Sequence, residues 1–330
     1  MTPARTARAK SRPALDADAL CALYERMLLI RRVEEGIQKL FLHGEVHGTV
    51  HLYNGQEAVS VGVCSALEAD DQIAATYRGH GAAIAKGTAP EAVIAELLGR
   101  TTGICGGRGG SMNLVDRANG LLFCSGIIGG SIATATGAAL SAKGAGRVAV
   151  AFFGDGTVNQ AYFHECLNFA RVLDLPLLLV CENNLYGEFT PMAQVTAGGD
   201  IAARAAAYAV RSEKVDGNDV EAVHRSTAAA VARIRAGKGP ELIEALTYRH
   251  FGHSKSDPGS YRPKEEVAAW RERDPLLIAA ARLTGELGVA EDDLRAVEAR
   301  VEAEVEDAVA AALAAPYPET RLDAATEYAA

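Results

Sequence analysis

Two polar motifs, each placed directly after an apolar run, set the strongest constraint on the fold of this chain. Gly154-Asp155-Gly156 follows the run from Val148 to Phe153, and Asn183-Asn184 follows the run from Leu177 to Cys181. The segment between them, from Asn159 to Arg171, has room for one helix. A strand, a helix and a second strand in close succession form a parallel β-α-β unit. The pattern therefore predicts an α/β fold, a parallel sheet flanked by helices, with both motifs at strand carboxyl ends, where such sheets bind ligands.

The paired motifs carry the ligands that a small hard cation prefers. Asp155 offers a carboxylate and Asn184 an amide oxygen, and magnesium takes such oxygens in an octahedral shell that often includes phosphate oxygens. Gly156 would let the main chain approach a phosphate closely, at the start of a helix whose dipole favours negative charge. Gly-Asp-Gly alone would also suit an ordinary strand-to-helix turn, but the second motif favours a site for magnesium and a diphosphate.

Several other segments, taken with these motifs, resemble the thiamine diphosphate enzymes, whose signature is Gly-Asp-Gly followed by an asparagine at this kind of distance. More narrowly, the chain resembles the alpha subunit of the decarboxylating first component of 2-oxo acid dehydrogenase complexes, which include pyruvate dehydrogenase and acetoin dehydrogenase. The resemblance covers roughly residues 20–275. The matching segments are residues 51–58, 77–81, 106–112, 126–129 and 248–254.

The resemblance implies which residues contact the cofactors. The magnesium ligands would be Asp155, Asn184 and the main-chain carbonyl of Tyr186. Two arginines would hold the diphosphate through their permanently charged forks. Ile128 would support the thiamine in a bent conformation, and Thr157 stands where family members often have alanine. The full set of residues expected to contact thiamine diphosphate is Tyr77, Arg78, Gly126, Ile128, Asp155, Gly156, Thr157, Asn184, Tyr186 and Arg249.

The resemblance also implies catalytic residues and partners. His51, His80 and His253 would face the reacting carbon as proton donors or hydrogen-bond partners. In this family a glutamate that activates the cofactor comes from a separate beta subunit, and this sequence offers no candidate for it. The chain would thus supply half of an active site in an α2β2 assembly. A lipoyl-bearing acyltransferase component would be the further partner, because it receives the acyl group.

The sequence leaves two classes of substrate open, 2-oxo acids and neutral compounds such as acetoin. The expected activity is that of a pyruvate dehydrogenase-like oxidoreductase, which decarboxylates a 2-oxo acid and transfers the acyl group to a lipoyl group. Glu188 stands where a methionine or a small residue is usual. If it faces the site, it would repel a 2-oxo carboxylate and favour a neutral substrate such as acetoin. A scaffold subunit without activity is a third reading, which the intact Asp155, Asn184, Arg249 and His253 disfavour.

Composition narrows the partners and the location. The net charge of −9 excludes nucleic acid as a partner, because phosphate binding needs a basic surface. No apolar run is long enough to span a membrane. The six cysteines are scattered without a short-spaced pair, which indicates free thiols and a cytoplasmic protein. The mitochondrial matrix would replace the cytoplasm if the basic N-terminus were a transit segment.

The chain is expected to contain one structured domain. Residues 1–14 are basic and free of acids, which favours a disordered tail over a targeting segment. Residues 15–330 would form a single α/β domain that ends in a helical segment, at residues 286–315. A helix is expected from Thr88 to Leu98, with Thr88 and Glu91 as its capping box. Further helices are expected at Leu20–Leu42, Ser131–Ala142, Asp200–Ala209 and Val220–Ala236, and a third strand at Glu241–Thr247.

Overall fold

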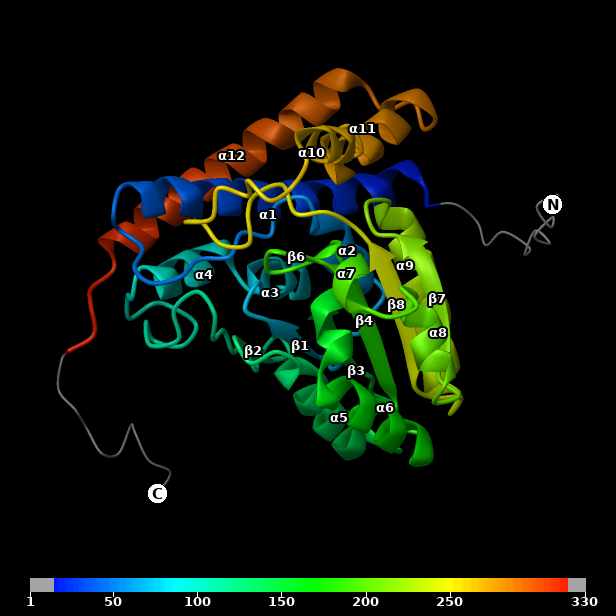
Figure 1. The fold of residues 1–330 in the computed structure, drawn as a ribbon. Helices are drawn as coiled ribbons and strands as arrows, with labels where there is room; N and C mark the ends of the chain where they lie inside the picture. Colours follow the sequence, from blue (N-terminus) through cyan, green and yellow to red (C-terminus); the bar gives the residue numbers. More distant parts are fainter. Residues whose placement is uncertain (1–14, 320–330) are drawn as a thin grey trace.

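The structure, a computed structural model, describes residues 15–319, and a six-stranded sheet lies at their centre (Figure 1). All the neighbouring strands of this sheet pair in parallel. This arrangement confirms the predicted fold class. In spatial order the strands are β2 (Leu121–Ser125), β1 (Gln72–Thr76), β3 (Ala149–Gly154), β4 (Leu177–Asn183), β8 (Glu241–Leu246) and β7 (Arg211–Asp216).

The central strands are apolar because helices cover both of their faces. Along β3, Val150 and Phe152 belong to one core, whereas Ala151 and Phe153 belong to the other. This alternation follows from the two-residue period of a strand. The smaller core lies against α5 (Gly130–Ala142), α6 (Ala161–Val172) and α8 (Ile201–Ala206). The larger core lies against α1 (Ala17–Leu42), α2 (Glu57–Cys64), α3 (His80–Lys86), α4 (Pro90–Leu97), α9 (Val220–Arg235), α11 (Pro275–Gly285) and α12 (Glu291–Ala314).

Short elements complete the edge of the sheet that carries the site. The 3-10 helix η1 (Asp155–Asn159) follows β3 directly, and β5 (Tyr186–Gly187) pairs with β6 (Thr190–Pro191) just after β4. The short helix α7 (Met192–Val195) follows β6, and α10 (Lys264–Arg271) lies ahead of α11. The chain after β8 therefore passes over the strand ends before it reaches the helical C-terminal segment (Figure 1).

Local interactions explain where α1 and α4 begin. Asp16 caps α1, because its Oδ1 accepts the amide of Ala19 at 2.9 Å. The capping box expected at Thr88 is wrong, since α4 begins at Pro90 without a side-chain cap. Thr88 instead donates its hydroxyl to Asp116 Oδ2 at 2.7 Å. Proline suits the first turn of a helix because its fixed φ matches the helix and its missing N–H has no partner there.

The expected helices and third strand are present with shifted ends, and the long C-terminal helix begins at Glu291 rather than at residue 286. The elements that sequence patterns missed are β1, β2, β7, α2, α3, α10 and α11, together with the short elements η1, β5, β6 and α7. Residues 1–14, predicted to be a basic tail, lie outside the described residues. From residue 15 to residue 319, no helix has the length and apolar character needed to cross a membrane. All six cysteines are free thiols, as predicted.

Candidate active site

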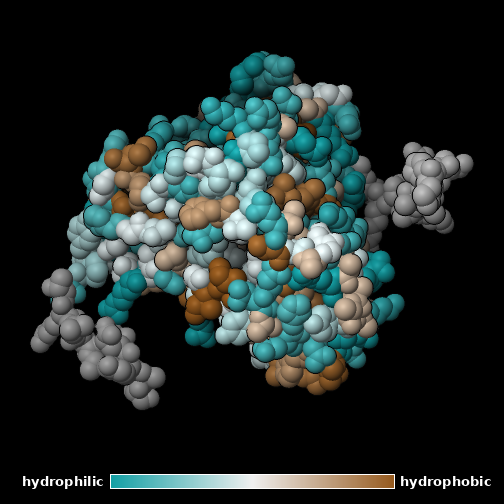
Figure 2. Space-filling view, in the orientation of Figure 1, coloured by the Kyte–Doolittle hydropathy of each residue, from teal (hydrophilic) through white to brown (hydrophobic). Residues whose placement is uncertain are grey.

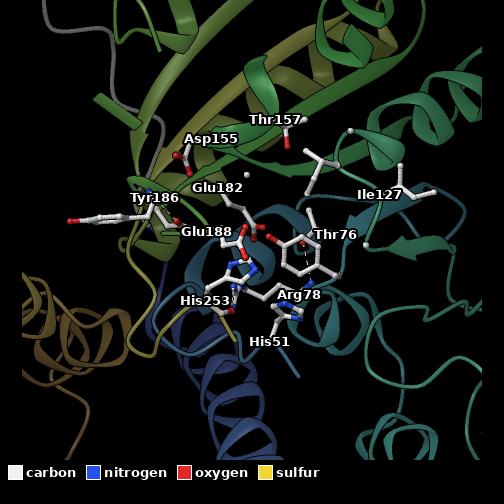
Figure 3. Close-up of a pocket in the computed structure, with 18 of the residues that line it drawn as sticks. His51, Thr76, Arg78, Ile127, Asp155, Thr157, Glu182, Tyr186, Glu188 and His253 are labelled. Atoms are coloured by element: carbon white, nitrogen blue, oxygen red, sulfur yellow. Dashed lines mark hydrogen bonds between the residues drawn. The ribbon is translucent and has the colours of Figure 1, made fainter. Parts of the chain in front are cut away.

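A cavity of about 510 Å³ lies at the carboxyl ends of the strands. Its wall comes from the segments that follow β1, β2, β3, β4 and β8, together with His51 from the loop before α2 (Figure 3). The five loops meet because the strands are parallel, so their carboxyl ends share one edge of the sheet. The structure brings together these predicted site residues on its wall: His51, Tyr77, Arg78, Gly126, Ile128, Asp155, Gly156, Thr157, Asn184, Tyr186, Arg249 and His253.

The proposed metal ligands include a buried oxygen without a partner. Asp155 is 1% exposed, and its Oδ2 accepts no hydrogen bond from the described residues. Burial raises the pKa of Asp155 to about 6. The amide of Asn184 is oriented by Gln56, whose Oε1 accepts Asn184 Nδ2 at 2.9 Å. An unpaired carboxylate in a buried site is costly, and a cation is the group that would compensate it.

Two arginines give the same cavity a concentration of positive charge. Arg249 is 2% exposed, and within residues 15–319 neither Arg78 nor Arg249 forms an ion pair with a carboxylate. Both guanidiniums donate to neutral groups instead. Arg78 bonds the carbonyls of Leu52 at 2.5 Å and His253 at 2.8 Å, and Arg249 bonds the carbonyl of Glu188 at 2.5 Å. Burial and the neighbouring Arg78 lower the pKa of Arg249 to about 10.

Two of the three predicted histidines meet inside the cavity. The rings of His51 and His253 lie 4.9 Å apart, and the ring of Tyr77 lies 4.4 Å from His51. Burial first, and then the charge of Arg78, lower the pKa of His51 to about 2 and that of His253 to about 4. Both imidazoles are therefore neutral near pH 7. His51 Nδ1 is buried and has no hydrogen-bond partner among the described groups.

Comparison with known proteins assigns the family. The model of the dehydrogenase E1 component family matches residues 25–321. The chain belongs to this family. It is similar to the alpha subunit of acetoin:2,6-dichlorophenolindophenol oxidoreductase from Bacillus subtilis (strain 168), with 44% identity over 90% of this chain and 89% of that protein. It is also similar to the pyruvate dehydrogenase E1 component subunit alpha of Rhizobium meliloti (strain 1021), with 40% identity over 90% of this chain and 86% of that protein.

Membership of the dehydrogenase E1 component family confirms the predicted resemblance. The chain is an E1 alpha-type subunit of a thiamine diphosphate-dependent oxidoreductase. A third relative, the alpha subunit of acetoin:2,6-dichlorophenolindophenol oxidoreductase from Cupriavidus necator, is 40% identical over 95% of this chain and 96% of that protein. Matches of this extent cover the whole sheet and all the strand-end loops that form the cavity.

His80 is the predicted site residue that this E1 alpha-type chain keeps off the cavity wall. It begins α3 and is fully buried. Its Nδ1 pairs with Glu34 Oε1 of α1 at 3.0 Å, and its Nε2 bonds Ser111 Oγ at 2.9 Å. Both ring nitrogens are thus occupied by protein groups. The arrangement fits a residue that positions the loop containing Ser111 rather than one that faces a substrate.

The E1 alpha-type cavity also contains residues that sequence patterns missed. Glu182 lies at the end of β4, is 5% exposed, and accepts the phenol of Tyr53. Burial raises the pKa of Glu182 to about 7. The sequence feature that could have identified Glu182 as a site residue is a carboxylate inside an apolar strand, directly before Asn183. Glu188, which the sequence left open as facing the site or not, lines the cavity near His253 in Figure 3. The other wall residues that were missed are Thr76, Met112, Ser125, Ile127, Gly129, Gly154, Gln160 and Gly187.

Proposed function

We propose that this chain anchors magnesium and thiamine diphosphate in a pyruvate dehydrogenase-like 2-oxo acid dehydrogenase. The observation that supports the proposal most directly is the buried, unpaired Oδ2 of Asp155 on the wall of a cavity that also carries Arg78 and Arg249. A carboxylate that lacks a cation and two guanidiniums that lack a carboxylate suit a magnesium-bound diphosphate. Bound thiamine diphosphate would supply the carbon nucleophile that attacks the substrate carbonyl.

The residues present fit this cofactor pair. Asp155, Asn184 and the carbonyl of Tyr186 would ligate the magnesium, since all three are on the cavity wall. The backbones of Gly156 and Gly187 run close together, because a Cβ on Gly156 would lie 3.3 Å from the Cα of Gly187. The main chain can therefore approach the diphosphate without side chains between them. Gly126 leaves space as well, with Met112 Sδ at 4.0 Å from a hypothetical Cβ.

Within the proposed reaction, the chain's own residues bind, orient and exchange protons. Arg249 and Arg78 would hold the diphosphate, which keeps the reactive end of the cofactor beside His51 and His253. Neutral His253 can donate a hydrogen bond from one nitrogen to an anionic oxygen that develops on the substrate. Arg249 supports this ring, because its NH1 lies 3.3 Å from His253 Nδ1. His80, through Ser111, would position a neighbouring loop.

We further propose that a beta subunit completes the site in an α2β2 assembly. Ile127 and Ile128 line the cavity but are 61% and 41% exposed. Phe169 and Val172 of α6 are 45% and 72% exposed, and apolar surface appears at the α5–α6 end of the face in Figure 2. Apolar residues exposed on this scale are typical of contacts with another chain. A lipoyl-bearing acyltransferase and a cytoplasmic location remain parts of this proposal.

Acetoin cleavage is the second candidate function, and Glu188 favours it. Its carboxylate-bearing side chain lines the cavity near His253 (Figure 3). A carboxylate on this wall would repel the carboxylate of a 2-oxo acid but not neutral acetoin. The effect on an exposed group is on the order of 1 kcal/mol, or about 5-fold. Two of the similar proteins described above are named for acetoin.

A product assay of the chain with its beta subunit tests both candidates. Pyruvate, branched-chain 2-oxo acids and acetoin are compared as substrates in the wild type, Glu188→Gln and Glu188→Asp. If Glu188 excludes 2-oxo acids, the Gln variant gains activity on pyruvate relative to acetoin, and the Asp variant does not. Failure of the wild type to bind thiamine diphosphate with magnesium in a calorimetric titration would contradict the proposed function itself.

A further inference from the structure

One carboxylate oxygen on α10 joins two of the loops that form the cavity. Glu266 Oε1 accepts the phenol of Tyr186 at 2.8 Å and the phenol of Tyr248 at 2.7 Å. Tyr186 begins β5, in the segment after β4, and Tyr248 lies just beyond the end of β8. Figure 3 shows the ring of Tyr186 pointing away from the cavity, so its phenol serves this contact rather than the cofactor.

The two tyrosines are direct neighbours of the residues that we assign to the cofactors. Tyr186 follows Asn184 by two residues and would give its own carbonyl to magnesium. Tyr248 precedes Arg249, which would contact the diphosphate. We propose that Glu266 is a positioning residue, which sets the spacing between the metal-binding loop and the diphosphate-binding loop. The named ligands rest on the proposed function, whereas the link between the two loops rests on the geometry alone.

Further contacts hold the second loop against the same segment. Trp270, one helical turn beyond Glu266, stacks on Tyr248 with the ring centroids 5.4 Å apart and the planes at 3°. The guanidinium of Arg262 lies 5.1 Å from the centre of the Tyr248 ring, and its NH1 donates to the carbonyl of Arg249 at 2.6 Å. Glu266, Trp270 and Arg262 therefore contact the chain at Tyr248 and Arg249 from one continuous segment.

The helix α10 has no buried residue, so half-buried side chains such as Glu266 and Trp270 make its contacts with the domain. Tyr186 and Tyr248, by contrast, are 6% and 1% exposed. Hydrogen bonds to a charged acceptor in such a setting are stronger than neutral ones.

The link is tested first without any cofactor, by amide hydrogen exchange on the full chain. Glu266→Ala is expected to increase exchange about 10-fold or more in both residues 184–190 and residues 249–253. Glu265→Ala, an exposed neighbour on the same helix, serves as the matched control and should leave both loops unchanged. Glu266→Gln should restore most of the protection, because one amide oxygen can accept both phenols. Faster exchange confined to residues 264–271 would overturn the proposal.

Conservative substitutions give a second test in which the helix stays in place. Tyr186→Phe, Tyr248→Phe and the double variant each remove only hydroxyl groups. The magnesium-dependent affinity for thiamine diphosphate should fall about 10-fold to 100-fold in Glu266→Ala. The losses of affinity in Tyr186→Phe and Tyr248→Phe should not add up to the loss in the double variant. Additive effects would show that the two loops are independent. If the wild-type chain with its beta subunit binds no cofactor, the proposed function fails, while the exchange experiment still decides the role of Glu266.

Trp270 provides an independent signal, because it is the only tryptophan of the sequence. Its fluorescence should become more accessible to acrylamide in Glu266→Ala than in Glu265→Ala. Unchanged quenching in Glu266→Ala would show that the stack on Tyr248 holds α10 without the carboxylate, which also contradicts the proposal.

Discussion

Glu96→Gln is expected to loosen the glycine-rich loop of residues 99–113 and to lower the stability of the chain. Glu96 lies in α4 and is fully buried. Its Oε2 accepts the amides of Cys105 at 2.7 Å and Gly107 at 2.9 Å. Its Oε1 accepts the amides of Gly109 at 2.6 Å and Gly110 at 3.2 Å. One carboxylate therefore supplies the acceptors for four amides of a loop without regular structure.

The size of the effect follows from the chemistry of the substitution. Glutamine replaces one of the two oxygens by an NH2 group, so two loop amides lose their acceptor and face a donor instead. Hydrogen bonds to charged groups contribute about 1.5–3 kcal/mol each, and a buried unsatisfied donor costs about as much. The expected loss is thus about 3–6 kcal/mol of unfolding free energy. That is a large share of the 5–15 kcal/mol that is typical of folded proteins.

Urea unfolding of the variant measures this loss, with Glu91→Gln as the control, because Glu91 is exposed on the same helix. The same loop contains Ser111, which bonds His80, and Met112, which lines the cavity. Glu96→Gln should therefore also weaken cofactor binding. A loss of stability no larger than that of Glu91→Gln would refute the reasoning, since it would mean that the loop finds other acceptors at no cost.

Four other outcomes are expected. Asp155→Ala should abolish magnesium-dependent cofactor binding and leave the fold intact, as calorimetric titration with circular dichroism would show. The purified chain should turn over substrate only when a beta subunit is added, so activity of the chain alone would contradict the shared site. His253→Ala should lower single-turnover rates about 10²-fold to 10⁴-fold with little change in cofactor affinity. Burial lowers the pKa of His250 to about 4, whereas histidine in an unfolded chain titrates near about 6.5. The unfolded chain therefore binds more protons than the folded chain, and the unfolding free energy falls as the pH drops from 7 to 5. In His250→Gln this fall should be smaller than in the wild type by about 1–2 kcal/mol, as urea unfolding at the two pH values would show.

The strand-end motifs were sufficient to predict the place of the cavity. Asp155 and Asn184 both follow apolar runs that were predicted to be parallel strands, and the carboxyl ends of parallel strands lie at one edge of the sheet. That reasoning needs no knowledge of distant contacts, which is why it succeeded. The same logic applied to Arg249, because it follows Glu241–Leu246, a buried parallel strand that sequence patterns also predicted. Elements with weaker patterns escaped this reasoning; β7, for example, has five polar residues among its six, and all five are exposed or half-buried.

The residues that sequence reasoning misplaced or missed depend on contacts between distant segments. His80 belongs to a motif that resembles an active-site segment, yet Glu34 of α1 and Ser111 of the glycine-rich loop occupy its two nitrogens. Which way an imidazole turns depends on those two partners, and neither is near it in sequence. Gln56 orients Asn184 across 128 positions of the chain, and Tyr53 contacts Glu182 across 129. Local periodicity contains no information on such pairs.

Asp155 and Arg249 carry opposite charges and line the same cavity, yet they form no ion pair with each other. Each is held in place by other groups: Asp155 by the turn that starts η1, and Arg249 by the carbonyl of Glu188 and the hydroxyl of Tyr261. Two such charges would attract strongly if their side chains were free to meet. Keeping them apart costs stability, and under the proposed function a cation at the carboxylate and an anion at the guanidinium would offset this cost. The separation of the two charges, rather than either residue alone, therefore suits the proposed ligand pair of magnesium and a diphosphate.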